Sequence, residues 1–207
     1  MGAITAIEAQ KRRGYRRSIF VDGEFLVGVH EDVVIALGLG VGQSFDEDRL
    51  VEILRAEDLR KARESAYRLL GYRDRSKAEV RKRLIAKDYP EDIVEEVIEQ
   101  LSGGGLLDDG KFSRDWVKSR TAAKPMGKTR LAWELRSKGV DASTVEEALE
   151  GLDEDTQLQL AISVAEKRLG KADRGDPNLK NRLSSLLRRR GFGWEVINKA
   201  IDELLQE

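Results

Sequence analysis

The sequence has no cysteine, one histidine and only three prolines among 207 residues. Without cysteine there is no disulfide framework, no thiolate metal site and no thiol nucleophile. Because His30 is the single histidine, most metal sites and general-base schemes lack the residues that they need. We interpret His30 as structural. Paired carboxylates such as Asp108 and Asp109 are better explained as caps of the helix that follows them. We therefore expect no catalytic residues, no metal and no cofactor, and a protein that is not an enzyme.

Long apolar runs are also absent. No window approaches the roughly 18 apolar residues of a membrane span, and the N-terminus lacks the apolar segment of a signal peptide. We expect a cytoplasmic protein. The scarcity of proline and the abundance of Leu, Glu, Lys, Arg and Ala predict a mainly α fold.

Residues 1 to about 45 differ from the rest because they are rich in Ile, Val and Phe. The segment RRSIFVDGEFLVGV contains Asp22-Gly23, a dipeptide typical of a two-residue hairpin turn. We predict a small β-meander, followed by a short helix at residues 31–37. The glycines of LGLGVG lack the Lys-Ser or Lys-Thr of a phosphate-binding loop and are interpreted as a connector.

An internal repeat covers the remaining chain. Its anchors, Leu84, Leu135 and Leu187, stand 51 and 52 residues apart. Matching apolar residues stand four residues before them (Val80, Leu131, Leu183) and seventeen after them (Leu101, Leu152, Leu204). The pattern predicts that each copy contains a basic helix with the anchor, a tight turn (AKDYP, SKGVD or RRGFG) and a second helix. Gly139 and Gly191 occupy turn positions that require positive φ, where the first copy has Asp88.

A further amphipathic stretch precedes each pair of helices, so we predict three three-helix modules at residues 53–105, 106–155 and 156–207, after a β-rich domain at 1–52. Because a helix of ~12 residues cannot bury its apolar stripe alone, neighbouring modules should pack into an elongated array. The aromatic residues Trp116, Trp133, Tyr67 and Tyr89 fall at apolar positions and are predicted to be mostly buried.

The formal net charge is −1, but charge alternates along the chain. Residues 55–87 carry 12 basic and 5 acidic side chains, whereas residues 88–110 carry 8 acidic and no basic ones. Acidic and basic helices could simply pair with each other. Alternatively, successive basic helices could form one contact surface for an acidic protein groove or a phosphate backbone. The predicted contact residues are Arg73, Arg75, Arg81, Lys82, Arg83, Lys118, Arg120, Lys128, Arg130, Arg188, Arg189 and Arg190.

Three segments resemble the core of the RecX family of regulatory proteins, in order and spacing: GYRDRSKAEVRKRLIAKDYPEDIVEEVIEQL (71–101), GLLDDGKFSRDWVKSR (105–120) and KPMGKTRLAWELRSKGVD (124–141). The third module and the VDGEF hairpin resemble longer members. Gly103 and Gly104 depart from the pattern, since the family tends to continue this helix with polar residues.

The resemblance implies a modulator that docks in the groove of the RecA filament on single-stranded DNA and restrains its ATPase and co-protease activities. Two other functions stay open from the residues themselves. Three helix-turn-helix units could present recognition helices to DNA, with direct DNA contact. The β-rich element could instead be the binding module of a structural adaptor. With no sustained heptad seam, we expect a monomer.

Overall fold

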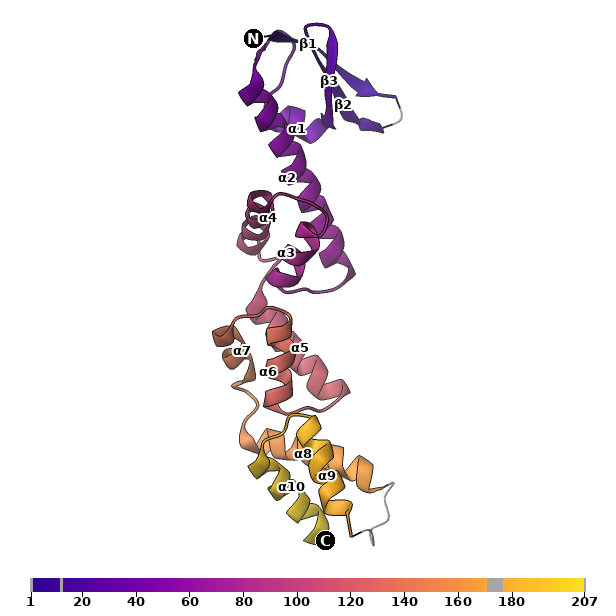
Figure 1. Ribbon diagram of the computed structural model, residues 1–207, viewed down its shortest axis with the longest axis vertical. Helices are drawn as coiled ribbons and strands as arrows, with labels where there is room; N and C mark the ends of the chain where they lie inside the picture. Colours follow the sequence, from indigo (N-terminus) through magenta and orange to yellow (C-terminus); the bar gives the residue numbers. More distant parts are fainter. Residues whose placement is uncertain (1, 12, 171–176, 207) are drawn as a thin grey trace. The chain divides into compact units, whose positions relative to one another are not determined.

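The computed structural model describes residues 2–11, 13–170 and 177–206, and within them ten helices and four strands (Figure 1). The mainly α class and the three helical modules predicted from the sequence are confirmed. The chain forms two compact units, which are described separately. The first contains the residues up to Arg73 and those from Val80 to Gly104; the second contains Asp74–Glu79 and the residues from Gly105 onward.

The first unit begins with an antiparallel sheet of strand order β3-β2-β1-β4. Its elements are β1 (Gly2–Gln10), β2 (Arg13–Val21), β3 (Glu24–His30), α1 (Glu31–Ala36) and β4 (Ser44–Phe45). Asp22 (φ 49°) and Gly23 (φ 87°) turn β2 into β3, so the predicted hairpin is confirmed. The two-residue β4, which pairs with the start of β1, was not predicted.

Helix α2 (Glu47–Tyr72) serves both the sheet and the first module. Its N-terminal half contributes Ile53 to the apolar core beneath the sheet, where Ile4, Ile19 and Val29 are buried. The same helix packs against α4 of the first module. The domain boundary expected at residue 52 therefore falls inside a continuous helix, which is shared by the sheet and the first module.

The helices α3 (Lys77–Ile85) and α4 (Glu91–Gly103) form the predicted pair of the first module. Val80 and Leu84 of α3 are fully buried, as are Val94 and Val97 of α4. Helix α4 ends at Gly103, and Gly104 is its C-cap. The two glycines therefore lie where α4 ends.

The second unit contains two further modules, each with its own apolar core. The middle module consists of α5 (Asp109–Ala123), α6 (Lys128–Ser137) and α7 (Ala142–Leu149). The C-terminal module consists of α8 (Glu154–Leu169), α9 (Leu179–Arg189) and α10 (Trp194–Gln206). Leu160 packs against both cores, so the two modules share a continuous apolar contact.

The three anchors Leu84, Leu135 and Leu187 each have 0% exposure, which confirms the repeat register. The prediction for the aromatic residues is wrong at two positions, because Trp133 is 57% and Tyr67 48% exposed. Trp133 lies two residues from both buried leucines of α6, Leu131 and Leu135. Two residues correspond to about 200° around a helix, so the ring is directed away from the core.

Within the second unit, a tight turn packs on the start of an anchor helix at two places, and we call each of these contacts a joint. The hydroxyl of Ser76 donates to the carbonyl of Lys138 at 2.5 Å, and the added Cβ of an alanine at Gly139 would lie 2.3 Å from the Cβ of Ala78. One repeat later, the amide of Gly127 donates to the carbonyl of Arg190 at 3.0 Å. Each joint thus places the tight turn of one module on the start of the preceding anchor helix.

Candidate partner-binding surfaces

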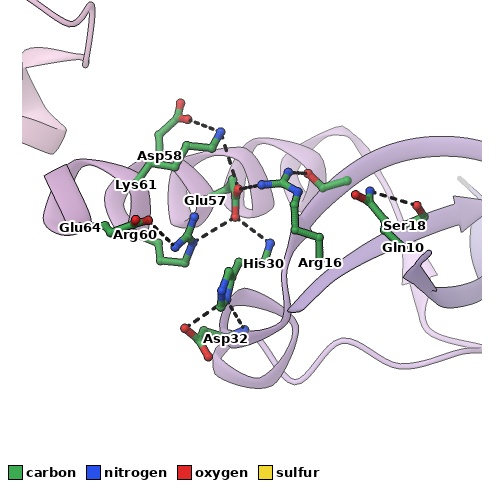
Figure 2. Close-up of polar contacts among 11 residues, drawn as sticks. Gln10, Arg16, Ser18, His30, Asp32, Glu57, Asp58, Arg60, Lys61 and Glu64 are labelled. Atoms are coloured by element: carbon green, nitrogen blue, oxygen red, sulfur yellow. Dashed lines mark hydrogen bonds and ion pairs between the residues drawn. The ribbon is translucent and has the colours of Figure 1, made fainter. Parts of the chain in front are cut away.

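A polar cluster of the first unit centres on Glu57, a buried carboxylate with 3% exposure (Figure 2). Arg16 of β2 donates to its Oε1 at 3.0 Å, and the backbone amide of His30 donates to its Oε2 at 2.9 Å. Arg60 and Lys61 lie within ion-pair distance. This carboxylate therefore fastens two strands to α2, and the cluster is fully explained by its structural role.

His30 also has a structural role, as interpreted from the sequence. Its backbone contributes to the Glu57 cluster, while its side chain caps α1 by accepting from the amide of Asp32 at 3.2 Å. Glu57 was missed by sequence reasoning because its burial depends on strands that come 27 to 41 residues earlier.

In the first module, one of the predicted contact residues, Arg81, forms an ion pair within the module. Arg81 binds Glu95 of α4 through two hydrogen bonds of 2.5 and 2.6 Å, and these bonds lower the pKa of the Glu95 carboxyl. Arg55 likewise pairs with Asp92 and Glu96. Pairing between basic and acidic helices thus accounts for these two arginines. Lys82 and Arg83, on the same turn of α3, are exposed.

The middle module gathers its charges around Trp116 and Glu134. The indole Nε1 of Trp116 donates to Glu134 at 3.2 Å, and Arg120 pairs with the same carboxylate at 3.0 Å. Arg120 and Lys138 both lie over the Trp116 ring, 4.4 and 4.2 Å from its centroid. These contacts hold α5 and α6 together, so Arg120 has a demonstrable structural role.

Arg130 combines an ion pair with an exposed aromatic contact. It pairs with Glu134 at 3.4 Å and lies over the ring of Trp133, 4.5 Å from the centroid. Of the other predicted contact residues in this module, Lys118 is exposed and Lys128 is half-buried. The backbone amide of Lys128 bonds to Gln157 at 3.2 Å.

In the C-terminal module, Arg190 is half-buried and donates to the carbonyl of Pro125 at 3.2 Å. Arg188 and Arg189 are exposed in the last turn of α9. Ahead of α3, Arg73 is exposed and Arg75 half-buried. The predicted set therefore includes side chains held by acidic partners or carbonyls (Arg81, Arg120, Arg130 and Arg190) and exposed side chains on α3, α5 and α9 (Lys82, Arg83, Lys118, Arg188 and Arg189).

The paired carboxylates have capping roles rather than catalytic geometry. Asp108 caps α5 by accepting from the amide of Lys111 at 2.9 Å, and this bond lowers the pKa of Asp108. Asp109 accepts from the amide of Lys77 at 2.9 Å, and its partial burial raises its pKa. Asp141 caps α7 in the same way, through Thr144. In the described part of the chain, no three His, Cys, Asp or Glu residues group as a metal site, and no helix could span a membrane.

Four domain families match the chain in order. They are the RecX N-terminal domain at residues 2–46, the first three-helix domain of RecX at 62–101, the second at 108–149 and the third at 155–201. The matches cover the sheet and all three helical modules.

Individual relatives agree with the domain matches. The Regulatory protein RecX of Clostridioides difficile (strain 630) is 31% identical over 99% of this chain and 97% of its own. That of Bacillus velezensis is 33% identical over 98% of this chain and 78% of its own. A crystal structure of regulatory protein RecX covers 100% of this chain and 99% of its own, with a TM-score of 0.80 and 28% identity. The chain therefore belongs to the RecX family of regulatory proteins.

Proposed function

We propose that this protein binds the RecA filament on single-stranded DNA, within its helical groove, and inhibits its recombinase, ATPase and co-protease activities. It would act in the cytoplasm as a monomer, in the regulation of recombination, DNA repair and the SOS response, without catalysing a reaction. The observation that carries the proposal is the match to all four RecX domains, in order, along one chain. The relatives are named as regulatory proteins, in agreement with this role.

The exposed members of the predicted basic set are the proposed filament contacts. Lys82 and Arg83 directly precede the anchor Leu84 on α3, whereas Arg188 and Arg189 directly follow the anchor Leu187 on α9. Exposed rim charges mainly affect association rate and salt dependence. Arg81, Arg120 and Arg130, which hold carboxylates of their own modules, would contribute less.

The structure gives a physical reason to prefer this function over helix-turn-helix recognition of DNA. In such a motif the helix after the tight turn enters the major groove. Here that helix is acidic: α4 carries five acidic residues and no basic one, and α7 carries two and none. Acidic helices would be repelled by the phosphates that border the groove.

The test is RecA ATPase on single-stranded DNA with increasing amounts of this protein. The triple variant K82E/R83E/K118E should need at least about tenfold more protein for half-suppression, with an unchanged unfolding midpoint. The control K87E/R114E/R136E reverses three other exposed charges by the same amount and should stay within about twofold of the unaltered protein.

Three outcomes would count against the proposal. The unaltered protein could leave RecA ATPase unchanged, or both variants could lose the effect equally. The triple variant could also unfold several degrees earlier yet suppress normally, which would assign these charges to the fold. The adaptor function predicts a different result: substitution of the exposed Ile35 and Val41 by aspartate would abolish the effect, whereas filament binding through the modules should survive it.

A further inference from the structure

A groove of about 400 Å³ lies between α6 and α7, two helices that pack against each other in the middle module (Figure 1). Its floor is apolar and consists of Ala132 from α6 and of Val145 and Leu149 from α7. Val145 and Leu149 belong to the core of the module, whereas Ala132 is half-buried. Both helices and the turn that joins them lie wholly within the described residues. We call this feature the α6–α7 groove.

The two walls of the groove carry opposite charges. Lys128 and Arg136 of α6 line one wall, and Glu146 of α7 and its C-cap Glu150 line the other. Arg136, Glu146 and Glu150 are exposed, and Lys128 is half-buried. Among the described residues, no ion pair joins one wall to the other. The groove is therefore open between a basic wall and an acidic wall.

In the first module, an arginine closes the equivalent space between α3 and α4. Arg81 stands 51 residues before Ala132, at the same place in the repeat, and Glu95 stands 51 residues before Glu146. Arg81 donates to Glu95 through two hydrogen bonds of 2.5 and 2.6 Å, from one helix of the pair to the other. In the middle module, alanine replaces this arginine, so no side chain crosses from this position to Glu146.

In the C-terminal module, a different ion pair joins the equivalent helices α9 and α10. Lys180 and Asp202 stand 52 residues after Lys128 and Glu150, and their side chains pair at 3.2 Å. Both other modules thus have an ion pair across their helix pair, at positions where the middle module has none. Because they form the same buried anchor and core positions with these pairs, the fold does not require the two walls of the middle module to stay apart.

An exposed tryptophan lies beside the basic wall. Thr129, Trp133 and Arg136 follow one another at intervals of four and three residues, so they lie on one face of α6. Trp133 is 57% exposed, and the guanidinium of Arg130 lies 4.5 Å from the centroid of its ring. Tryptophan and arginine are among the residues that most often contribute large shares of the binding energy at protein interfaces.

We propose that the α6–α7 groove binds an amphipathic helix of a partner protein. The apolar stripe of that helix would face the floor, with acidic residues along the edge toward α6 and basic residues along the edge toward α7. Lys128 and Arg136 are eight residues apart, or about 12 Å, so about two turns of the partner helix would lie in the groove. A nucleic acid fits less well, because Glu146 and Glu150 would repel its phosphates.

The inference is independent of the proposed function, because no groove residue is among the exposed side chains proposed to contact the filament, and every measurement is made without RecA. The probe is a phage-displayed library of peptides of about 16 residues, or about four helical turns. Peptides that bind the variant A132R are first removed, and the rest are selected on the full chain. A132R restores the arginine of the first module, so it should pair with Glu146, close the groove and keep the unfolding midpoint at least as high as that of the unaltered protein.

The selected peptides should carry apolar residues at intervals of three and four, with acidic residues on one edge and basic residues on the other. The peptide that is recovered most often is then labelled, and its dissociation constant is measured by fluorescence anisotropy. E146K/E150K changes two exposed residues outside the module core and should raise the dissociation constant at least about tenfold. This variant also replaces A132R in the selection if A132R does not fold. The matched control A122R adds a positive charge at an exposed position of α5 and should bind within about twofold of the unaltered protein.

An exchange of charge tests the basic wall. K128E/R136E should weaken binding of the peptide at least about tenfold. Replacement of the acidic residues of the peptide by lysine should restore binding to this variant and should weaken binding to the unaltered protein. A contact that is only apolar would not respond to the exchange.

The proposal is overturned if no selected peptide distinguishes the unaltered protein from the closed variant, or if the selected peptides carry charges of one sign only. It is also overturned if E146K/E150K, folded by circular dichroism, binds the peptide as tightly as the unaltered protein does. Competition by oligothymidylate for the groove would indicate a nucleic acid instead. Self-association that A132R abolishes, measured by sedimentation equilibrium, would indicate a second copy of this chain, and either result would overturn the assignment to a partner protein.

Discussion

Replacement of Gly191 by alanine should weaken the joint between the middle and C-terminal modules. Gly191 has φ of 82°, in the left-handed region, where a side chain costs about 1–2 kcal/mol. The new Cβ would also lie 2.4 Å from the backbone nitrogen of Arg130, which is far inside van der Waals contact. Backbone atoms cannot rotate away as a flexible side chain can, so the turn must move off α6.

That movement would break the backbone bonds that close the joint. The amide of Gly127 donates to the carbonyl of Arg190, and the amide of Thr129 donates to that of Gly191. At ~1 kcal/mol for each bond, together with the strain at Gly191, the free energy of unfolding should fall by about 3 kcal/mol or more. The module cores are not touched, so helicity should be retained at low denaturant concentration.

Two control variants distinguish the steric clash at the joint from the backbone strain of the turn. Gly151 has no positive φ and no atom within 4 Å of an added Cβ, so G151A should change stability by less than about 0.5 kcal/mol. Asp88 occupies the equivalent turn in the first module with φ of 61° and is exposed. D88A keeps the backbone strain without the steric clash and should cost about 1 kcal/mol or less.

Urea unfolding followed by circular dichroism gives the free energies, and hydrogen exchange reports the joint directly. In G191A, the amides of Gly127 and Thr129 should lose protection before the core of either module does. If G191A costs no more than D88A and both amides stay protected, the joint does not depend on the close approach at Gly191 and the reasoning is refuted.

Three further predictions concern single side chains. L135A should lower the free energy of unfolding by about 2–5 kcal/mol, and a loss under about 0.5 kcal/mol in urea unfolding would contradict the repeat register. E57A should lower the free energy of unfolding by about 3 kcal/mol or more, because it leaves Arg16 and the amide of His30 without their buried partner. E64A removes an exposed ion pair with Arg60 on the same helix and should leave the free energy of unfolding nearly unchanged in the same assay. Asp141 has a pKa below its ordinary 3.8 because Thr144 and Ser143 donate to it, so its contribution is complete above that value and is lost as pH falls through the folded pKa. D141N should therefore lose less free energy of unfolding than the unaltered protein as the pH is lowered, and an equal loss would contradict the capping role.

Much of the helical core was predictable because it depends on local periodicity. The anchors Leu84, Leu135 and Leu187, and their apolar neighbours, recur at the helical period and at the long repeat, and all three anchors are buried. The same reasoning failed for Trp133, where aromatic character was given more weight than its place on the helix. Because Trp133 is two residues from each buried leucine of α6, its ring could not also face the core.

The basic helices could be predicted from the sequence, but the exposure and pairing of their individual side chains could not. Charge alternation along the chain indicates which helices are basic, and those helices carry exposed side chains at Lys82, Arg83, Lys118 and Arg189. Which arginines are instead held by carboxylates depends on side chains from other helices, as for Arg81 with Glu95. The distance in sequence between such partners carries no information about their pairing.

The sequence by itself determined the helical class, the hairpin at Asp22-Gly23 and the turn glycines, because each depends on residues that are close together in the sequence. It also determined the three-module repeat, because the same local pattern recurs at a fixed long period. The tertiary structure alone decided the burial of Glu57 and the continuity of α2 from the sheet into the first module. It also decided the close approach at Gly191. These features join segments that are distant in sequence, and their energies come from packing, desolvation and charge, which act only once the chain has folded.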